Sequence, residues 1–73
     1  MSDRGTLWRH KKTDHIYQFV CEATIEATMT PAVIYGSADT RRIWVRPKDE
    51  FYDGRFVKLS DEEDAAARAA RQQ

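Results

Sequence analysis

The chain has 73 residues, of which 12 are Lys or Arg and 12 are Asp or Glu, so its formal net charge at neutral pH is zero. This length allows one small domain with little room for a deep active site, and the charge balance lacks the basic excess of a dedicated nucleic-acid binder. Cys21 is the only cysteine, which excludes an internal disulfide and a cysteine-based zinc site and fits a reducing, cytoplasmic setting.

The N-terminal part of the chain predicts a flexible leader and then a hairpin. Residues 1–5 form the leader, and no apolar run behind them could act as a signal peptide or a membrane span. Residues 6–10 and 15–23 alternate in polarity and indicate two strands, and the polar residues 11–14 indicate the turn between them. The alternation puts four residues of the second strand on one face: Tyr17, Phe19, Cys21 and Ala23.

The middle of the chain predicts two further strands. Residues 24–30 are ambiguous between a helical turn and an irregular loop, because the proline that follows them disfavours helix at their end. Residues 32–35 form a clear strand, residues 36–40 have the composition of a turn, and residues 41–46 form the next strand.

The last strand follows a helical turn. Pro47 has no N–H to donate, so it ends its strand or lies at a sheet edge. Residues 48–52 predict a single helical or 3₁₀ turn, the Asp-Gly pair at 53–54 predicts a tight turn, and residues 55–59 predict a strand.

These elements predict a mainly β domain over residues 6–59. Five short strands favour a small closed sheet, because closure removes edges that invite aggregation. An SH3-like five-stranded barrel fits best, whereas an OB-like barrel needs longer strands than this chain supplies.

Residues 60–73 predict a C-terminal tail that is helical or disordered. Ser60 and Glu63 have the spacing of a capping box, and the alanine-rich body has high helix propensity. The body has no large apolar side chain, so we expect a helix that frays or that orders against a partner.

Several motifs are shared with a known family. They are His10-Lys11-Lys12, Tyr17, Val33-Ile34-Tyr35, Trp44-Val45-Arg46-Pro47, Phe51 and Asp53-Gly54-Arg55-Phe56. With them, residues 7–59 resemble the bacterial and phage proteins grouped as DUF1653. The resemblance implies an SH3-like β-barrel and, for a chain this short, a phage or prophage origin, but no established activity. Residues 27–30 lack the acids that many bacterial members carry there.

Two groups of side chains are candidate binding residues. Trp44 and Arg46 share a strand face and could form an aromatic and guanidinium platform for a ligand ring, a nucleotide or an acidic group. The structural alternative is that Trp44 caps the barrel while Arg46 pairs with Asp53 or Asp49. A basic patch could form if the first and fourth strands converge, and scattered solvated charges are the alternative; its members would be Arg9, Lys11, Lys12, Arg41 and Arg42. The full predicted binding set is Trp8, Arg9, His10, Lys11, Lys12, Tyr35, Arg42, Trp44 and Arg46.

Catalytic and metal sites are not predicted. His10 and His15 lack an evident nucleophile and orienting acid, so we expect solvated strand-end histidines. Cys21 is expected to be a small core residue and Asp53 to cap a turn. No cofactor is expected.

The sequence favours a non-enzymatic binding module, phage or prophage encoded, that recognises a protein partner such as a host factor through aromatic side chains and loops. The alternative is nucleic-acid or anionic nucleotide binding at the basic turn and Trp44. No membrane contact is expected, homodimer formation through the tail is open, and the expected location is the cytoplasm of a bacterial or phage-infected cell.

Overall fold

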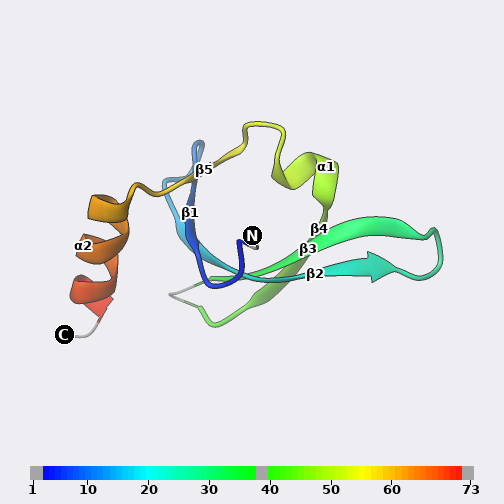
Figure 1. Cartoon of the computed structure of the whole chain (residues 1–73), viewed down its shortest axis with the longest axis horizontal. Helices are drawn as coiled ribbons and strands as arrows, with labels where there is room; N and C mark the ends of the chain where they lie inside the picture. The colour runs from blue at the N-terminus through cyan, green and yellow to red at the C-terminus, as the bar shows by residue number, and fades with distance from the viewer. Residues whose placement is uncertain (1–2, 38–39, 72–73) are drawn as a thin grey trace.

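The computed structural model describes residues 3–37 and 40–71 and contains one antiparallel sheet with two helices (Figure 1). The strands are β1 (Leu7–His10), β2 (Ile16–Ile25), β3 (Thr30–Ser37), β4 (Ile43–Pro47) and β5 (Phe56–Lys58). The helices are α1 (Lys48–Phe51), between β4 and β5, and α2 (Asp61–Arg71), after β5. The predicted mainly β fold, with a helical turn before the last strand and a C-terminal helix, is confirmed.

The sheet curls but does not close. Its strand order is β4-β3-β2-β1-β5, so β4 and β5 form its two edges, and no pairing joins them within the described part of the chain. The shape is therefore barrel-like at most, with α1 crossing between the two edges (Figure 1). The expected closed barrel is thus an open, strongly curved sheet.

The β2–β3 hairpin is longer than the sequence pattern predicts. Ile25 pairs with Thr30, which leaves residues 26–29 as a tight turn in place of the ambiguous segment. Met29 has a φ of 56°, the left-handed conformation that such a turn requires. At its other end β3 runs on to Ser37, so part of the predicted turn at 36–40 is strand, and positions 38 and 39 lie outside the described residues.

Phe51 of α1 is the centre of the core and is fully buried. Its ring lies 4.7–5.5 Å, centroid to centroid, from the rings of Trp8, Phe19, Tyr35 and Phe56. Each buried ring removes roughly 150–250 Å² from water, so this cluster accounts for much of the hydrophobic stabilisation. We call the sheet face that packs against Phe51 the inner face, and the opposite one the outer face.

A β-bulge in β2 changes which residues share a face. The register between β2 and β3 shifts between Phe19 and Cys21, which places Cys21 opposite Ile34 and Glu22 opposite Val33. Because directly opposite residues point to the same side of a sheet, Glu22 joins Phe19 on the inner face. The predicted face is therefore wrong beyond Phe19: Cys21 and Ala23 lie on the outer face, and Cys21 is only partly buried. Regular alternation cannot reveal an inserted residue.

The capping box at the start of α2 is confirmed. The N–H of Glu63 donates to Ser60 Oγ, and the N–H of Ser60 donates to Glu63 Oε1, each at 3.1 Å. The Arg68 guanidinium donates to the carbonyl oxygen of Gly5 at 2.7 Å, and Arg9 pairs with Glu63 at 3.5 Å. The helix therefore orders against the chain's own N-terminal segment.

Candidate ligand-binding cleft

An aromatic cleft opens on the inner face of the sheet, beside the Phe51 core. Its volume is about 170 Å³, and all five strands and the turn after β1 supply parts of its wall. The lining residues are His10, Thr13, Tyr17, Tyr35, Trp44, Arg46 and Phe56.

Strand register explains why these side chains meet. His10 lies opposite Phe56 on the pair β1–β5, and Tyr35 lies opposite Trp44 on the pair β3–β4. Opposite residues share a face, and the curl of the sheet turns the inner faces of its two ends toward each other. Residues far apart in sequence therefore line one cleft.

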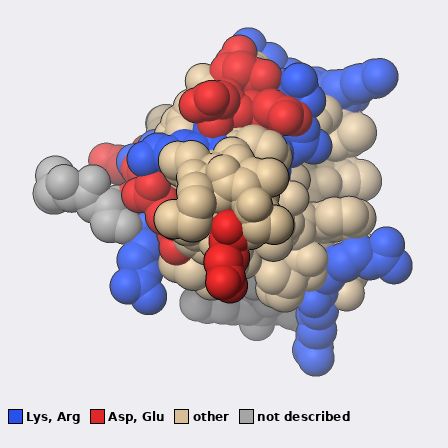
Figure 2. Space-filling model, turned by 90° about the vertical axis from the view of Figure 1, so that its right-hand side faces the viewer, with Lys and Arg blue, Asp and Glu red and all other residues tan. Residues whose placement is uncertain are grey.

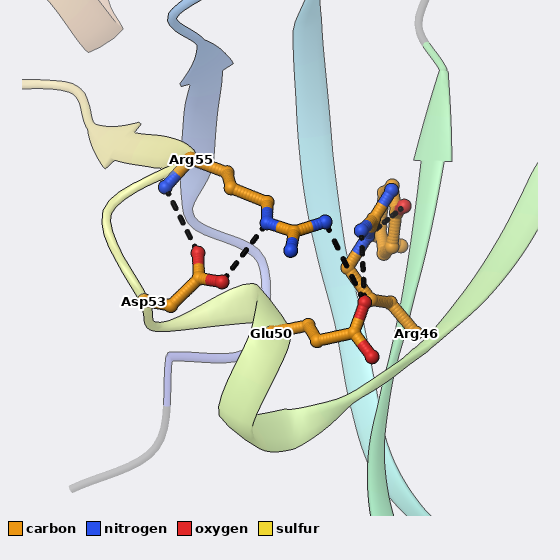
Figure 3. A network of polar contacts seen from close by, with 5 residues as sticks. Arg46, Glu50, Asp53 and Arg55 are labelled. Carbon is orange, nitrogen blue, oxygen red and sulfur yellow. Dashed lines mark hydrogen bonds and ion pairs between the residues drawn. The ribbon is translucent and has the colours of Figure 1, made fainter.

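Arg46 is the best-anchored polar group of the cleft. Its Nε donates to the hydroxyl oxygen of Tyr35 at 3.3 Å, and its Nη1 lies 3.3 Å from Glu50 Oε1 (Figure 3). Its guanidinium carbon lies 5.7 Å from the centre of the Phe56 ring. A guanidinium is charged throughout the physiological pH range, and the hydrogen bond to Tyr35 raises the pKa of Arg46 still further.

The acidic partner of Arg46 differs from the prediction. We expected Asp53 or Asp49, but α1 brings Glu50 to Arg46 because the two residues lie one helical turn apart. Asp53 instead accepts hydrogen bonds from the backbone N–H of Arg55 at 3.1 Å and from its Nε at 2.9 Å (Figure 3). Its predicted turn-capping role is confirmed.

Trp44 forms the exposed wall of the cleft. It is 41% exposed, and the Arg42 guanidinium carbon lies 5.6 Å from its ring centre. On the far side of Trp44 lies a second hollow of about 260 Å³. This hollow is lined by His15, Tyr17, Ser37, Thr40, Arg42 and Trp44. Because the two hollows share Tyr17 and Trp44, they form adjoining parts of one surface.

The structure brings together about half of the predicted binding set. The cleft and its neighbouring hollow contain His10, Tyr35, Arg42, Trp44 and Arg46. Lys11 and Lys12 are exposed in the turn after β1, between the lining residues His10 and Thr13, and the N–H of Lys12 donates to His10 Nδ1 at 3.2 Å.

Two predicted binding residues lie elsewhere. Trp8 is 7% exposed and belongs to the core, and its indole N–H donates to Thr6 Oγ1 at 2.9 Å. Arg9 points to the outer face, where it pairs with Asp14 and Glu63, so the predicted basic patch does not include it. The alternation of β1 separates Trp8 from Arg9, but the sequence pattern does not say which of two tryptophans is covered by α1.

Sequence reasoning missed several lining residues. The predicted binding set omits Tyr17 and Phe56, which the sequence indicates only as strand or family-motif residues, and Thr13, which it places only in a turn, yet all three line the cleft. The Tyr17 ring packs edge to face against two others: its centroid lies 5.4 Å from that of Tyr35 and 5.9 Å from that of Phe56. The strand order, if known, would have identified them, because it shows which inner-face positions surround Tyr35.

Other regions of the surface carry different features. Figure 2 views the end of the molecule formed by the β2–β3 hairpin, where Asp and Glu side chains lie among uncharged ones and Lys and Arg side chains project at the rim. Within residues 3–37 and 40–71, no group of three His, Cys, Asp or Glu side chains could hold a metal ion. No helix of this same part is long and apolar enough to cross a membrane.

Comparison with known proteins identifies a family. The chain matches the family model described as "Protein of unknown function (DUF1653)" over residues 6–65, which covers the whole sheet, α1 and the first turn of α2. No curated protein and no solved structure matches the chain.

Proposed function

Because the chain belongs to the DUF1653 family, whose description names no activity, we propose a function from the cleft: a non-enzymatic binding module that recognises a segment of a protein partner. The observation that carries this proposal is the half-exposed Trp44 beside the anchored Arg46 at the open side of the sheet. Trp, Tyr and Arg are the residue types that dominate binding energy at protein interfaces.

The size of the cleft favours side chains of a polymer over a small molecule. Sites for drug-sized ligands measure roughly 300–1,000 Å³, whereas this cleft measures about 170 Å³ and the adjoining hollow about 260 Å³, so each is separately below that range. A space of this size accommodates a single side chain, and the adjoining hollow accommodates its neighbour. A partner that presents consecutive side chains therefore fits both.

The geometry is organised before any ligand arrives. The rings of the cleft pack edge to face, and Arg46 is held by Tyr35 and Glu50. Ordering a flexible side chain during binding costs roughly 0.5–1.5 kcal/mol, and this cost is already met for Arg46 by its intramolecular contacts. Arg42, Lys11 and Lys12 add positive charge around the rim, so an acidic partner is favoured.

The expected phage or prophage origin bears on the identity of the partner. In that setting the module would work in the cytoplasm of the bacterial or infected cell, and a host protein would be its natural partner.

Nucleotide or single-stranded nucleic-acid binding is the second candidate. The exposed Trp44 ring with Arg42 beside it favours this function, because stacking of a base on an aromatic ring contributes roughly 1–3 kcal/mol. The zero net charge of the whole chain argues against it as the main function.

Selection from a random peptide library tests the proposal. We expect peptides that bind the wild-type protein and lose about tenfold or more in affinity for Trp44→Ala. Met29→Ala is the matched control, because it also removes an exposed apolar side chain but lies at the hairpin turn, away from the cleft. If no peptide distinguishes wild type from Trp44→Ala, while single-stranded DNA or RNA binds with salt-sensitive affinity, the second candidate replaces the first.

A further inference from the structure

We propose that the partner segment binds as an additional β-strand on the free edge of β4, with acidic side chains that pair with Arg42 and Arg46. This inference rests on the proposed function, since it names the conformation and the chemistry of the protein segment that the cleft recognises. The argument uses the direction of the backbone groups of β4, the side chains on its two faces, and the charges next to it.

The backbone of β4 offers free hydrogen-bonding groups. β4 is an edge strand, and the N–H of Ser37 donates to the carbonyl of Arg42 at 2.9 Å. In an antiparallel ladder, residues that bond to the neighbouring strand alternate with residues that point away. Trp44 and Arg46 therefore continue the ladder with β3, and Ile43 and Val45 direct their N–H and C=O groups to the open edge.

Pro47 supports this assignment. It pairs with Ala32 at the end of β4 and lies two residues after Val45, so its nitrogen also belongs to the open-edge positions. Proline within a sheet is found where no ladder hydrogen bond is needed. Its position is the one that the alternation predicts for an edge strand facing solvent.

The side chains of β4 present two different faces to an incoming strand. Trp44 and Arg46 lie opposite Tyr35 and Val33 on the inner face. Ile43 and Val45 lie on the outer face and are 61% and 57% exposed. An incoming strand places alternate side chains beside each face, so its outer residues would be apolar and its inner residues would border the cleft.

The charges decide against a second copy of this chain as the occupant. The antiparallel register that would use all four free groups pairs Ile43 with Val45 of the second copy. That register puts Arg42 opposite Arg46 of the second copy, and symmetry repeats the contact. Like charges directly opposite each other destabilise a strand pair. A segment with an acid at each of these positions forms ion pairs in the same register.

The complementary segment has a defined order of side chains. Opposite Arg42 and Arg46 it carries acids, opposite Trp44 an aromatic residue, and opposite Ile43 and Val45 apolar residues. Glu-Val-Phe-Val-Glu satisfies this order whichever way it is read, and the probe is a synthetic peptide with this sequence between glycine and serine flanks. One control peptide carries Lys in place of both Glu residues. A second, Val-Glu-Phe-Glu-Val, has the same composition with the acids too close together to reach both arginines.

The experiment is an NMR titration of the full chain with hydrogen-exchange measurements. We expect the first peptide to slow exchange of the Ile43 and Val45 amides and to shift the Trp44 indole signal. We expect both control peptides to bind at least about tenfold more weakly than the first peptide, because each loses charged contacts. Added salt should weaken the first peptide's binding.

Proline substitutions distinguish binding to the backbone edge of β4 from binding in the cleft alone. Val45→Pro removes an open-edge donor and leaves Trp44 and Arg46 in place, and we expect it to lower affinity for the first peptide by about tenfold or more. Lys58→Pro is the matched control on the other edge strand. The N–H of Leu59 bonds to Leu7 and the N–H of Lys11 bonds to Arg55, so the alternation turns the Lys58 N–H away from β1. This control should bind the peptide like wild type.

The outcomes distinguish this inference from the proposed function. Indole shifts without slower exchange at Ile43 and Val45 would show a segment bound in the cleft alone; the strand addition would be overturned and the proposed function would stand. Equal binding of the Lys-containing peptide, or no binding of the first peptide at millimolar concentration, would also overturn the strand addition. Concentration-dependent protection of the same amides without peptide would identify a second copy as the occupant. If Val45→Pro fails to fold, hydrogen exchange of the Ile43 and Val45 amides in the wild-type protein, with and without the first peptide, still tests the strand addition.

Discussion

Arg46 and Tyr35 are diagonal neighbours on β4 and β3, and the Nε of Arg46 donates a 3.3 Å hydrogen bond to the Tyr35 hydroxyl oxygen. Tyr35 is buried, so this bond links the aromatic core to the charged side of the cleft. One side chain therefore contributes to packing and holds the guanidinium that we propose binds the ligand.

Replacement of Tyr35 by Phe tests this relationship. We expect Tyr35→Phe to lower the free energy of unfolding by roughly 0.5–1.5 kcal/mol, because the ring is kept while one hydrogen bond is lost. Urea denaturation measures the change. Tyr17→Phe is the control, since its hydroxyl has no hydrogen-bond partner within residues 3–37 and 40–71. Equal destabilisation by both variants would contradict the role of the Arg46 contact.

Phe51 is the residue on which the fold depends most. We expect Phe51→Ala to cost about 3–5 kcal/mol, because it empties the centre of a cluster of four further rings. The hydrophobic core of a domain of this size rarely supplies more than about 3–5 kcal/mol of stability, so the variant should be largely unfolded at 37 °C. Thermal unfolding followed by near-ultraviolet circular dichroism measures this. Phe51→Leu should retain a cooperative transition, and a stable Phe51→Ala protein would show that α1 does not organise the core.

Asp3 should contribute acid-sensitive stability. The Tyr52 hydroxyl donates to Asp3 Oδ2 at 2.8 Å, and this bond lowers the pKa of Asp3 below its ordinary value of 3.8. A carboxylate with a lowered folded-state pKa stabilises the protein fully above its ordinary pKa and loses that contribution as the pH falls through the lowered value. The difference in free energy of unfolding between wild type and Asp3→Asn should therefore shrink as the pH falls below about 4.

Tyr52→Phe provides the matched test of this mechanism. It removes the largest cause of the Asp3 shift and keeps the ring contact with Trp8 at 5.7 Å. In this background the Asp3 pKa, followed by NMR, should move up toward its ordinary value. An unchanged Asp3 titration would show that the ion pair with Lys58, at 3.1 Å, dominates instead.

Ser60 should control the start of α2. We expect Ser60→Ala to destabilise the helix by about 0.5–2 kcal/mol, because it removes the oxygen that accepts from the N–H of Glu63. Faster hydrogen exchange of the amides in the first turn of α2 measures the loss. Ser60→Thr keeps the acceptor and should exchange like wild type. Unchanged exchange in Ser60→Ala would indicate that the Arg68 contact to Gly5 suffices to hold the helix.

The direction of the β4 backbone can be tested without any ligand. Trp44→Pro removes a ladder donor to β3, whereas Val45→Pro removes a donor that faces the open edge. Relative to Trp44→Ala, we expect Trp44→Pro to lower the free energy of unfolding by at least about 1–3 kcal/mol more, because a buried acceptor on β3 loses its partner. Relative to Val45→Ala, we expect Val45→Pro to lower the free energy of unfolding only slightly. Chemical denaturation of the four variants gives the comparison, and a reversed order would show that β4 has the opposite alternation.

Local residue patterns were sufficient for the elements and their order. Alternation in residues 15–23, the Asp-Gly pair at 53–54 and the spacing of Ser60 and Glu63 each reflect interactions among near neighbours, so the strands, the turn and the helix cap could be predicted. The family could also be identified from short motifs such as Trp44-Val45-Arg46-Pro47 and Asp53-Gly54-Arg55-Phe56, and the match over residues 6–65 confirms it.

Tertiary structure alone decided which aromatic side chains are exposed beside the cleft. Trp8 and Trp44 occupy similar alternating strands, but α1 covers the first and leaves the second 41% exposed. The bulge after Phe19 moved Cys21 to the outer face, and the open sheet left β4 as an edge next to the cleft. These outcomes depend on strand register and on contacts between residues far apart in the chain, and a period-two pattern carries no information about either.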